Sequence, residues 1–169
     1  MVSSPAASAQ HQTNNGFDKL LYTSEKDTLP YRFLKPENMQ AQNKFPLVIF
    51  LHGAGERGTD NKVQIKHISQ LFLNSKNRKK YSCFVLAPQC PQQIMWAAHD
   101  RVGSRLMMRE EPTAPMSMVI ELVDQIEREY AIDRSRIYVT GLSMGGYGTW
   151  DLIARFPQRF AAAVPICGG

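Results

Sequence analysis

A serine flanked by glycines is the feature of this sequence best suited to chemistry. Residues 141–145 read Gly-Leu-Ser-Met-Gly, and Ser143 stands between a β-branched run at 137–140 and a segment that can form a helix. At a tight strand-to-helix turn the serine takes an unusual backbone conformation, and glycines two residues to either side leave room where strand and helix cross. We therefore expect Ser143 to lie at such a turn, with its hydroxyl placed as a nucleophile.

A second glycine-rich segment follows an apolar run two strands earlier. Residues 52–55 read His-Gly-Ala-Gly and come directly after the run at 47–51. Attack on a carbonyl group builds negative charge on its oxygen, and backbone N–H groups can stabilise that charge. The sequence predicts that the N–H groups of Met144 and of Ala54, together with Gly53, form this oxyanion hole. The alternative is a turn that needs glycine for its geometry alone.

The segments around these residues alternate between strand and helix patterns. Apolar runs predict an antiparallel hairpin and then parallel strands, at residues 19–23, 30–35, 47–51, 82–87, 137–140 and 161–166. Helical periodicity marks residues 63–73, 116–130 and 145–156. This order predicts an α/β fold with a doubly wound, mostly parallel sheet. Residues 89–115 show no clean period and are expected to form a functional loop, and the basic run at 76–80 a solvated one.

Length and composition favour one soluble globular domain. The chain has 169 residues, of which 43% are hydrophobic and 21% charged, and we assign residues 17–169 to one domain and 1–16 to a disordered tail or a signal remnant. A signal remnant predicts a secreted or periplasmic protein, with the cytoplasm as the alternative. No apolar window approaches a membrane span, and the basic run is too bunched for a nucleic-acid surface. The three cysteines suit neither a disulfide framework nor a zinc site, so we expect no metal and no cofactor.

Several longer segments resemble one superfamily. Residues 51–58, 87–91 and 133–146, with Trp96, are similar to the α/β-hydrolase superfamily, and within it to bacterial esterases related to dienelactone hydrolase, polyhydroxybutyrate depolymerase and feruloyl esterases. The resemblance implies that Trp96 and His52 lie at the substrate pocket and that residues 56–57 brace the oxyanion loop. Trp96 could equally be a core or lid aromatic. We expect His52 to position the loop through hydrogen bonds rather than to transfer a proton.

The order of the ionisable residues departs from that superfamily. Its catalytic acid and histidine follow the serine, whereas all four histidines here precede Ser143 and the one later acid, Asp151, lies within the following helix. The resemblance therefore implies that the acid and the histidine lie beyond residue 169 and that the chain is an N-terminal portion, truncated before the last strands. We expect Asp151 to be structural or exposed. An apolar edge strand at 161–166 would favour a homo-oligomer or a complementing C-terminal fragment.

These observations predict a serine carboxylesterase. Its substrate is a small-molecule ester, of feruloyl or acetyl type by the resemblance, hydrolysed through an acyl-enzyme on Ser143. The same groups serve all acyl transfers, so a peptidase or a thioesterase on this fold is an alternative. A catalytically incomplete binding module is the alternative outside enzymes.

Overall fold

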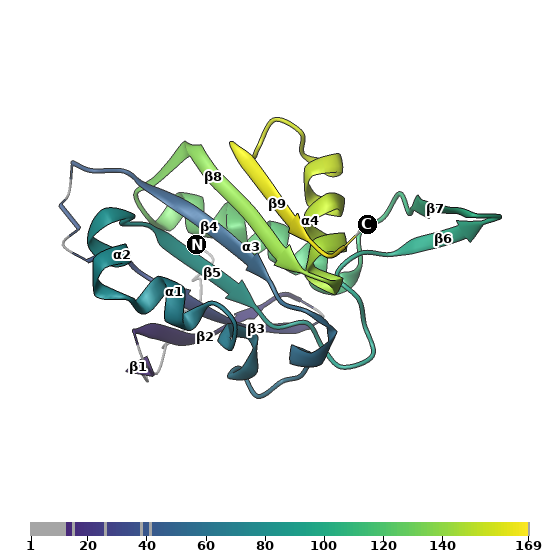
Figure 1. Ribbon diagram of the computed structural model, residues 1–169, viewed down its shortest axis with the longest axis horizontal. Helices are drawn as coiled ribbons and strands as arrows, with labels where there is room; N and C mark the ends of the chain where they lie inside the picture. The colour runs from purple at the N-terminus through teal and green to yellow at the C-terminus, as the bar shows by residue number, and fades with distance from the viewer. Residues whose placement is uncertain (1–12, 15, 26, 38, 41, 169) are drawn as a thin grey trace, which may run out of the picture.

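The protein is built around one twisted sheet with helices on both faces (Figure 1). The computed structural model describes residues 13–14, 16–25, 27–37, 39–40 and 42–168. In this part of the chain the sheet has seven strands in the order β1-β2-β3-β5-β4-β8-β9. Their bounds are β1 Thr13–Asn14, β2 Phe17–Thr23, β3 Thr28–Leu34, β4 Phe45–Leu51, β5 Phe84–Pro88, β8 Ile132–Leu142 and β9 Ala162–Ile166.

The strands pair as the sequence predicts. β2 and β3 form an antiparallel hairpin, and β3 pairs antiparallel with β5. The remaining neighbours, β5 with β4, β4 with β8, and β8 with β9, are all parallel. Leu51 at the end of β4 is opposite Gly141 near the end of β8. The loops that leave these two strands therefore begin at the same edge of the sheet.

Helix α3, Ala114–Glu129, covers one face of the sheet with a regular apolar stripe. Thr113 caps its start with a hydroxyl that accepts a hydrogen bond from the Met116 N–H at 3.3 Å, and Pro115 lies in its first turn. Helix α3 buries residues such as Val119 and Leu122 against the strands. Helix α4, Met144–Arg155, contributes to the same core. This confirms the helices predicted at 116–130 and 145–156.

The opposite face is covered by short helices, where the sequence predicts one continuous helix over 63–73. The structure has instead the 3₁₀ helix η2, Val63–Ile65, and then α1, Ser69–Leu73. Asn74 follows α1 in an extended conformation and caps α2, Ser75–Lys80, by accepting hydrogen bonds from the N–H groups of residues 76 and 77. The basic run is thus a short helix and not a loop, because an asparagine cap starts it.

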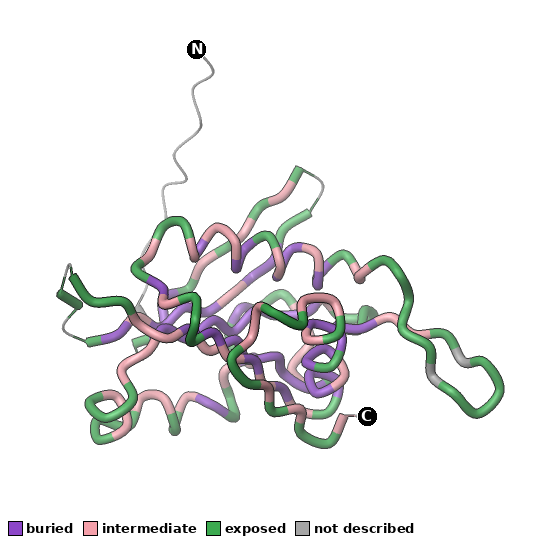
Figure 2. Tube along the Cα trace, turned by 90° about the horizontal axis from the view of Figure 1, so that it is seen from above, coloured by how far each residue is buried: buried purple, intermediate pink, exposed green. Residues whose placement is uncertain are grey.

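Two further departures concern irregular backbone. Residues 133–135, predicted as a turn before a strand, lie inside β8 at a bulge, where the register with β4 shifts between Phe45 and Leu47. Residues 89–115, predicted as a loop, contain a second sheet made of β6, His99–Val102, and β7, Arg105–Met108. Gly103 has φ 61° at the tip of this hairpin. The residues of this hairpin are mostly exposed, and the hairpin projects from the body of the molecule (Figures 1 and 2).

The amino-terminal segment differs from expectation in one detail. Residues 1–12 and 15 of the expected tail 1–16 lie outside the described residues, but Thr13–Asn14 form β1 and pair with β2. Strand β9 lies at an edge of the sheet in the described part of the chain, and Val164 is 55% exposed there.

Candidate active site

Ser143 is the single residue between the end of β8 and the start of α4. Its backbone has φ 51° and ψ −110°, and its side chain is exposed. A positive φ is strained for any residue with a Cβ, and such strain persists only where the surrounding structure enforces it. The sharp turn that the glycine spacing predicts is therefore confirmed.

The glycines on either side of the turn are required by close backbone contacts. A Cβ on Gly145 would lie 1.9 Å from the carbonyl oxygen of Leu51, and a Cβ on Gly141 would lie 2.2 Å from the carbonyl oxygen of Gly145. No side chain fits at these distances. Helix α4 can thus pass directly over the end of β4, which fixes where its first residue lies relative to the loop after Leu51.

Hydrogen bonds on both sides hold the Ser143 backbone in place. Its N–H donates to the carbonyl of Ile166 in β9 at 2.7 Å, and its own carbonyl accepts from the N–H of Gly146 at 2.8 Å. These bonds involve the backbone of Ser143 and leave its hydroxyl exposed. In the described part of the chain, no hydrogen bond joins it to a histidine.

The loop after β4 lies beside this turn. Gly53 precedes the 3₁₀ helix η1, Ala54–Glu56, and a Cβ on Gly53 would lie 3.9 Å from the Cβ of Ser143. Helices α4 and η1 begin at Met144 and Ala54, and the first N–H groups of a helix have no partner within it. The structure therefore brings together all the residues predicted for nucleophile and oxyanion hole, at the carboxyl edge of the sheet.

His52 is a buried, neutral support for this loop. Its side chain is 0% exposed, its Nδ1 is 2.7 Å from the carbonyl oxygen of Gly53, and its Nε2 accepts the N–H of Cys90 at 2.9 Å. Burial lowers the pKa of His52. A neutral ring with Nδ1 protonated satisfies both contacts, so neither nitrogen is free to accept a proton from Ser143.

Trp96 is the second support. Its side chain is 0% exposed, its indole N–H donates to the carbonyl of His52 at 3.1 Å, and its Cβ packs where Gly148 lacks a side chain. The expectation that Trp96 and His52 contact substrate is therefore corrected, because neither side chain reaches the surface. Trp96 is a core aromatic, the alternative that the sequence left open.

The segment after β5 supports the same loop through a set of hydrogen bonds that sequence reasoning missed. Gln89 is fully buried, and its amide donates to the carbonyl of Glu56 at 3.2 Å and to the Asp60 carboxylate at 2.8 Å. Its oxygen accepts the N–H of Asn61 at 2.7 Å. The one signal in the sequence is the Ala-Pro-Gln-Cys-Pro segment at 87–91, which belongs to the resemblance described above.

The residues expected to brace the oxyanion loop also contact it. The Arg57 guanidinium donates to the carbonyl of Ala54 at 3.0 Å, and the Glu56 N–H donates to the carbonyl of Gly53 at 3.2 Å. The Glu56 carboxylate lies 3.2 Å from the ring of His67. Loop 53–57 is therefore held by its own side chains as well as by the segment after β5.

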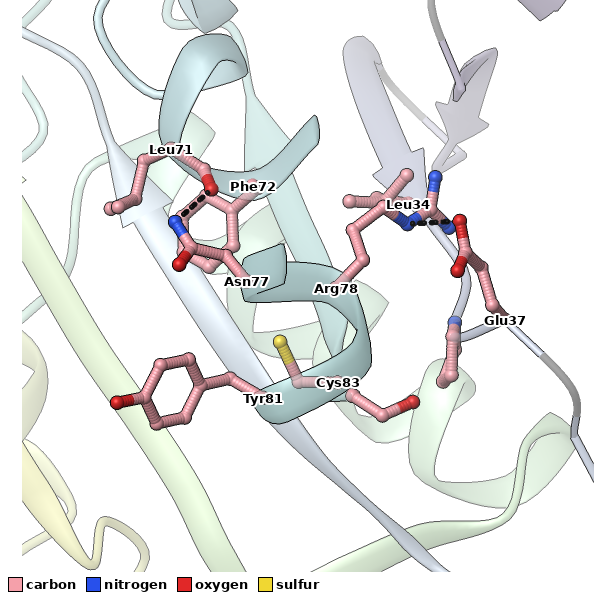
Figure 3. A pocket seen from close by; sticks show the side chains of 10 residues that line it. Leu34, Glu37, Leu71, Phe72, Asn77, Arg78, Tyr81 and Cys83 are labelled. Atoms are coloured by element: carbon pink, nitrogen blue, oxygen red, sulfur yellow. Dashed lines mark hydrogen bonds and ion pairs between the residues drawn. The ribbon is translucent and has the colours of Figure 1, made fainter. Parts of the chain in front are cut away.

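A pocket of about 280 Å³ lies elsewhere (Figure 3). It opens between the end of β3 and helices α1 and α2, and Cys83, just before β5, is part of its wall. It therefore lies toward the amino end of β5, whereas Ser143 follows the carboxyl end of β8. None of the predicted site residues lines it.

Two other kinds of site are absent from the described residues. No three His, Cys, Asp or Glu side chains there lie close enough together to bind a metal ion. None of the helices there has the length and apolar character of a membrane span.

Comparisons with known proteins find relatives that match parts of this chain. The model of the prolyl oligopeptidase family matches residues 105–168. Poly(3-hydroxyalkanoate) depolymerase C of Paucimonas lemoignei is 47% identical over 49 residues, 29% of this chain and 12% of the depolymerase. Acetylxylan esterase A of Emericella nidulans is 29% identical over 89 residues, 52% of this chain and 28% of that enzyme.

A solved structure matches over nearly the whole chain. The crystal structure of a thermostable esterase superposes with a TM-score of 0.82 and 42% sequence identity, covering 92% of this chain and 42% of the esterase. The chain spans less than half the length of each of these three proteins.

Proposed function

We propose that this chain, which is similar to an acetylxylan esterase and to a thermostable esterase, is the nucleophile-bearing part of a serine carboxylesterase of the α/β-hydrolase fold. One observation carries this proposal. Ser143 is exposed on a strained turn with φ 51°, directly beside Gly53 and the start of a helical turn at Ala54. A reactive hydroxyl and unpaired backbone N–H groups at one edge of a sheet are the groups that acyl transfer needs.

The reaction proceeds in two steps. The Ser143 oxygen attacks the ester carbonyl and its proton passes to a histidine, which then protonates the departing alcohol. The acyl group remains on the serine oxygen. Water, deprotonated by the same histidine, then attacks the acyl carbon, and the serine oxygen regains its proton as the carboxylic acid leaves. By the order of residues in this superfamily, we place that histidine and its acid partner in chain that follows residue 169.

The N–H groups of Met144 and Ala54 stabilise the negative oxygen in both steps. The contacts of Gln89, Arg57 and His52 keep the Ala54 loop in place, so these donors are oriented before the substrate arrives. Preorganisation of this kind is worth about 10²–10³ in kcat for each donor. A feruloyl- or acetyl-type ester is the substrate that we propose.

A peptidase is the second candidate function. The match of residues 105–168 to the prolyl oligopeptidase family favours it, because that match covers the turn at Ser143. An amide needs the same nucleophile and oxyanion donors as an ester. The relative rates on an ester and on the amide of the same acid would separate the two candidates.

The test is ester hydrolysis by the whole protein. Ser143→Ala should lower kcat by about 10⁶, as loss of the serine does in a protease that uses the same catalytic triad. Ser104→Ala, at the exposed hairpin tip, is the matched control and should keep wild-type activity. Turnover that survives Ser143→Ala at more than about a tenth of the wild-type rate would contradict the proposal.

A further inference from the structure

The base of the β6–β7 hairpin is fixed to α4, the helix that follows Ser143. On α4, the Arg155 guanidinium donates to the carbonyls of Arg109, at 2.7 Å, and of Glu110. Asp151, 3% exposed, holds Arg155 through contacts of 2.9 Å and 3.1 Å. The predicted structural role of Asp151 is thus confirmed. The ion pair sets the position of the hairpin relative to the serine, although the hairpin itself projects away from the sheet (Figure 1).

The two faces of the hairpin carry different residues. Residues directly opposite each other in an antiparallel pair point to the same face. His99 is opposite Met108 on one face, and Asp100 is opposite Met107 on the other. Met107 and Met108 are 52% and 46% exposed. Two neighbouring methionines of similar exposure therefore point to opposite sides of one ribbon.

The face with His99 and Met108 is turned toward the start of α4. The rings of His99 and Tyr147 stack with centroids 5.9 Å apart and planes 25° apart. Tyr147 lies in the first turn of α4, four residues after Ser143, and its N–H donates to the Ser143 carbonyl at 3.2 Å. The opposite face carries instead an ion pair between Asp100 and Arg109 at 2.6 Å.

We propose that His99, Met108 and Tyr147 form the surface that selects the substrate, by binding an aromatic ring attached to the scissile ester. This inference rests on the proposed esterase function and adds to it the residues that select the substrate. Two stacked rings and a polarisable thioether offer the contacts that an aromatic group prefers, namely offset stacking and sulfur at the ring edge. The exposed thioether of Met108 has that role, and Met107 does not because it faces away.

The test compares the two methionines in the whole protein. The kcat/KM values are measured for ethyl acetate, which has no ring, for phenyl acetate, with a ring on the alcohol side, and for methyl cinnamate, with a ring on the acyl side. Met108→Ser should lose about tenfold on at least one ring-bearing ester and less than twofold on ethyl acetate. Met108→Leu should keep most of the wild-type value, and Met107→Ser should stay within twofold on all three.

The outcomes separate the inference from the function beneath it. If ethyl acetate is hydrolysed in a Ser143-dependent way but Met108→Ser loses nothing, loses equally on all three esters, or is matched by Met107→Ser, the selecting surface is wrong and the esterase proposal stands. Failure of the wild-type protein on both ring-bearing esters also overturns the inference. Failure on every ester overturns the esterase proposal itself. Which ring-bearing ester suffers tells whether the surface faces the alcohol or the acyl group.

Discussion

The turn at Ser143 and the tip of the β6–β7 hairpin each contain a positive φ, but the structure enforces them differently. Around Ser143, with φ 51°, backbone from three elements closes in so tightly that a Cβ on Gly145 would lie 1.9 Å from a carbonyl oxygen. At Gly103, with φ 61°, no atom lies within 4 Å of an added Cβ. The positive φ at the serine is therefore imposed by packing, whereas at the hairpin tip a glycine adopts it without strain.

The largest effect should come from filling the tightest contact. Gly145→Ala has no space for its Cβ, so we expect a loss of roughly 3–5 kcal/mol in the free energy of unfolding, or no soluble protein. Gly55→Ala is the matched control, since a Cβ there meets nothing within 4 Å, and should change stability by less than about 0.5 kcal/mol. Denaturant titration measures both. A Gly145→Ala protein of normal stability would mean that packing does not enforce the turn.

The next effect concerns the loop that faces Ser143. Gln89→Leu removes contacts to Glu56, Asp60 and Asn61, so we expect kcat of the whole protein to fall about 10- to 100-fold with KM changed less than twofold, because the oxyanion donors are displaced. Gln92→Leu, which removes one exposed contact to the Arg57 carbonyl, should lower kcat far less. Steady-state kinetics decides, and equal losses in both variants would refute a special role for Gln89.

The buried ring of His52 should make stability depend on pH. Burial lowers its pKa in the folded protein below the value of about 6.5 of an exposed histidine. The unfolded chain therefore binds the proton first, and the stabilisation is complete above about pH 6.5 and lost as pH falls toward the lowered pKa. The slope is at most about 1.4 kcal/mol per pH unit.

Unfolding midpoints at several pH values between about 7.5 and 5 test this. His52→Gln should remove that part of the slope, while His67→Gln, whose ring is exposed, should keep it. A wild-type slope that survives in His52→Gln would place the responsible group elsewhere.

The smallest effect is expected at the hairpin tip. Gly103→Ala forces alanine into a positive φ at a cost of about 1 kcal/mol, but the hairpin is exposed and the cost stays local. Amide hydrogen exchange in β6 and β7 should become about fivefold faster, with no change in the central strands. Gly103→Asn should lie closer to wild type, since asparagine tolerates this conformation. Faster exchange in β4 or β8 would show that the hairpin is coupled to the core.

Whether a feature depends on nearby or on distant contacts decides whether the sequence could predict it. Strands β4 and β8, helix α3 and the turn at Ser143 are marked by apolar period and glycine spacing, which reflect local backbone and nearest packing. The meeting of the loops at Gly53 and Ser143 followed from the topology, since parallel neighbours end at one edge of a sheet. These parts were predicted correctly because each depends on contacts that leave a repeated pattern.

The remaining features depend on contacts between distant segments. Gln89 acts through residues 28 or more positions away, and Arg32 is buried with its guanidinium against the carbonyl of Asn61 at 2.7 Å. Single polar residues of this kind leave no period in the sequence. The hairpin was missed because its two strands have only four residues each, and Trp96 was misplaced because an aromatic before a loop suits a pocket wall as well as a core.

The central claim is that Ser143 carries the acyl group, and trapping that intermediate tests it most directly. The whole protein is mixed with an ester whose acyl-enzyme hydrolyses slowly, quenched in acid, digested and analysed by mass spectrometry. We predict one acyl adduct, on the peptide that contains Ser143, which disappears in Ser143→Ala and persists in Ser104→Ala. An adduct on another residue, or steady turnover with no adduct on Ser143, would contradict the account.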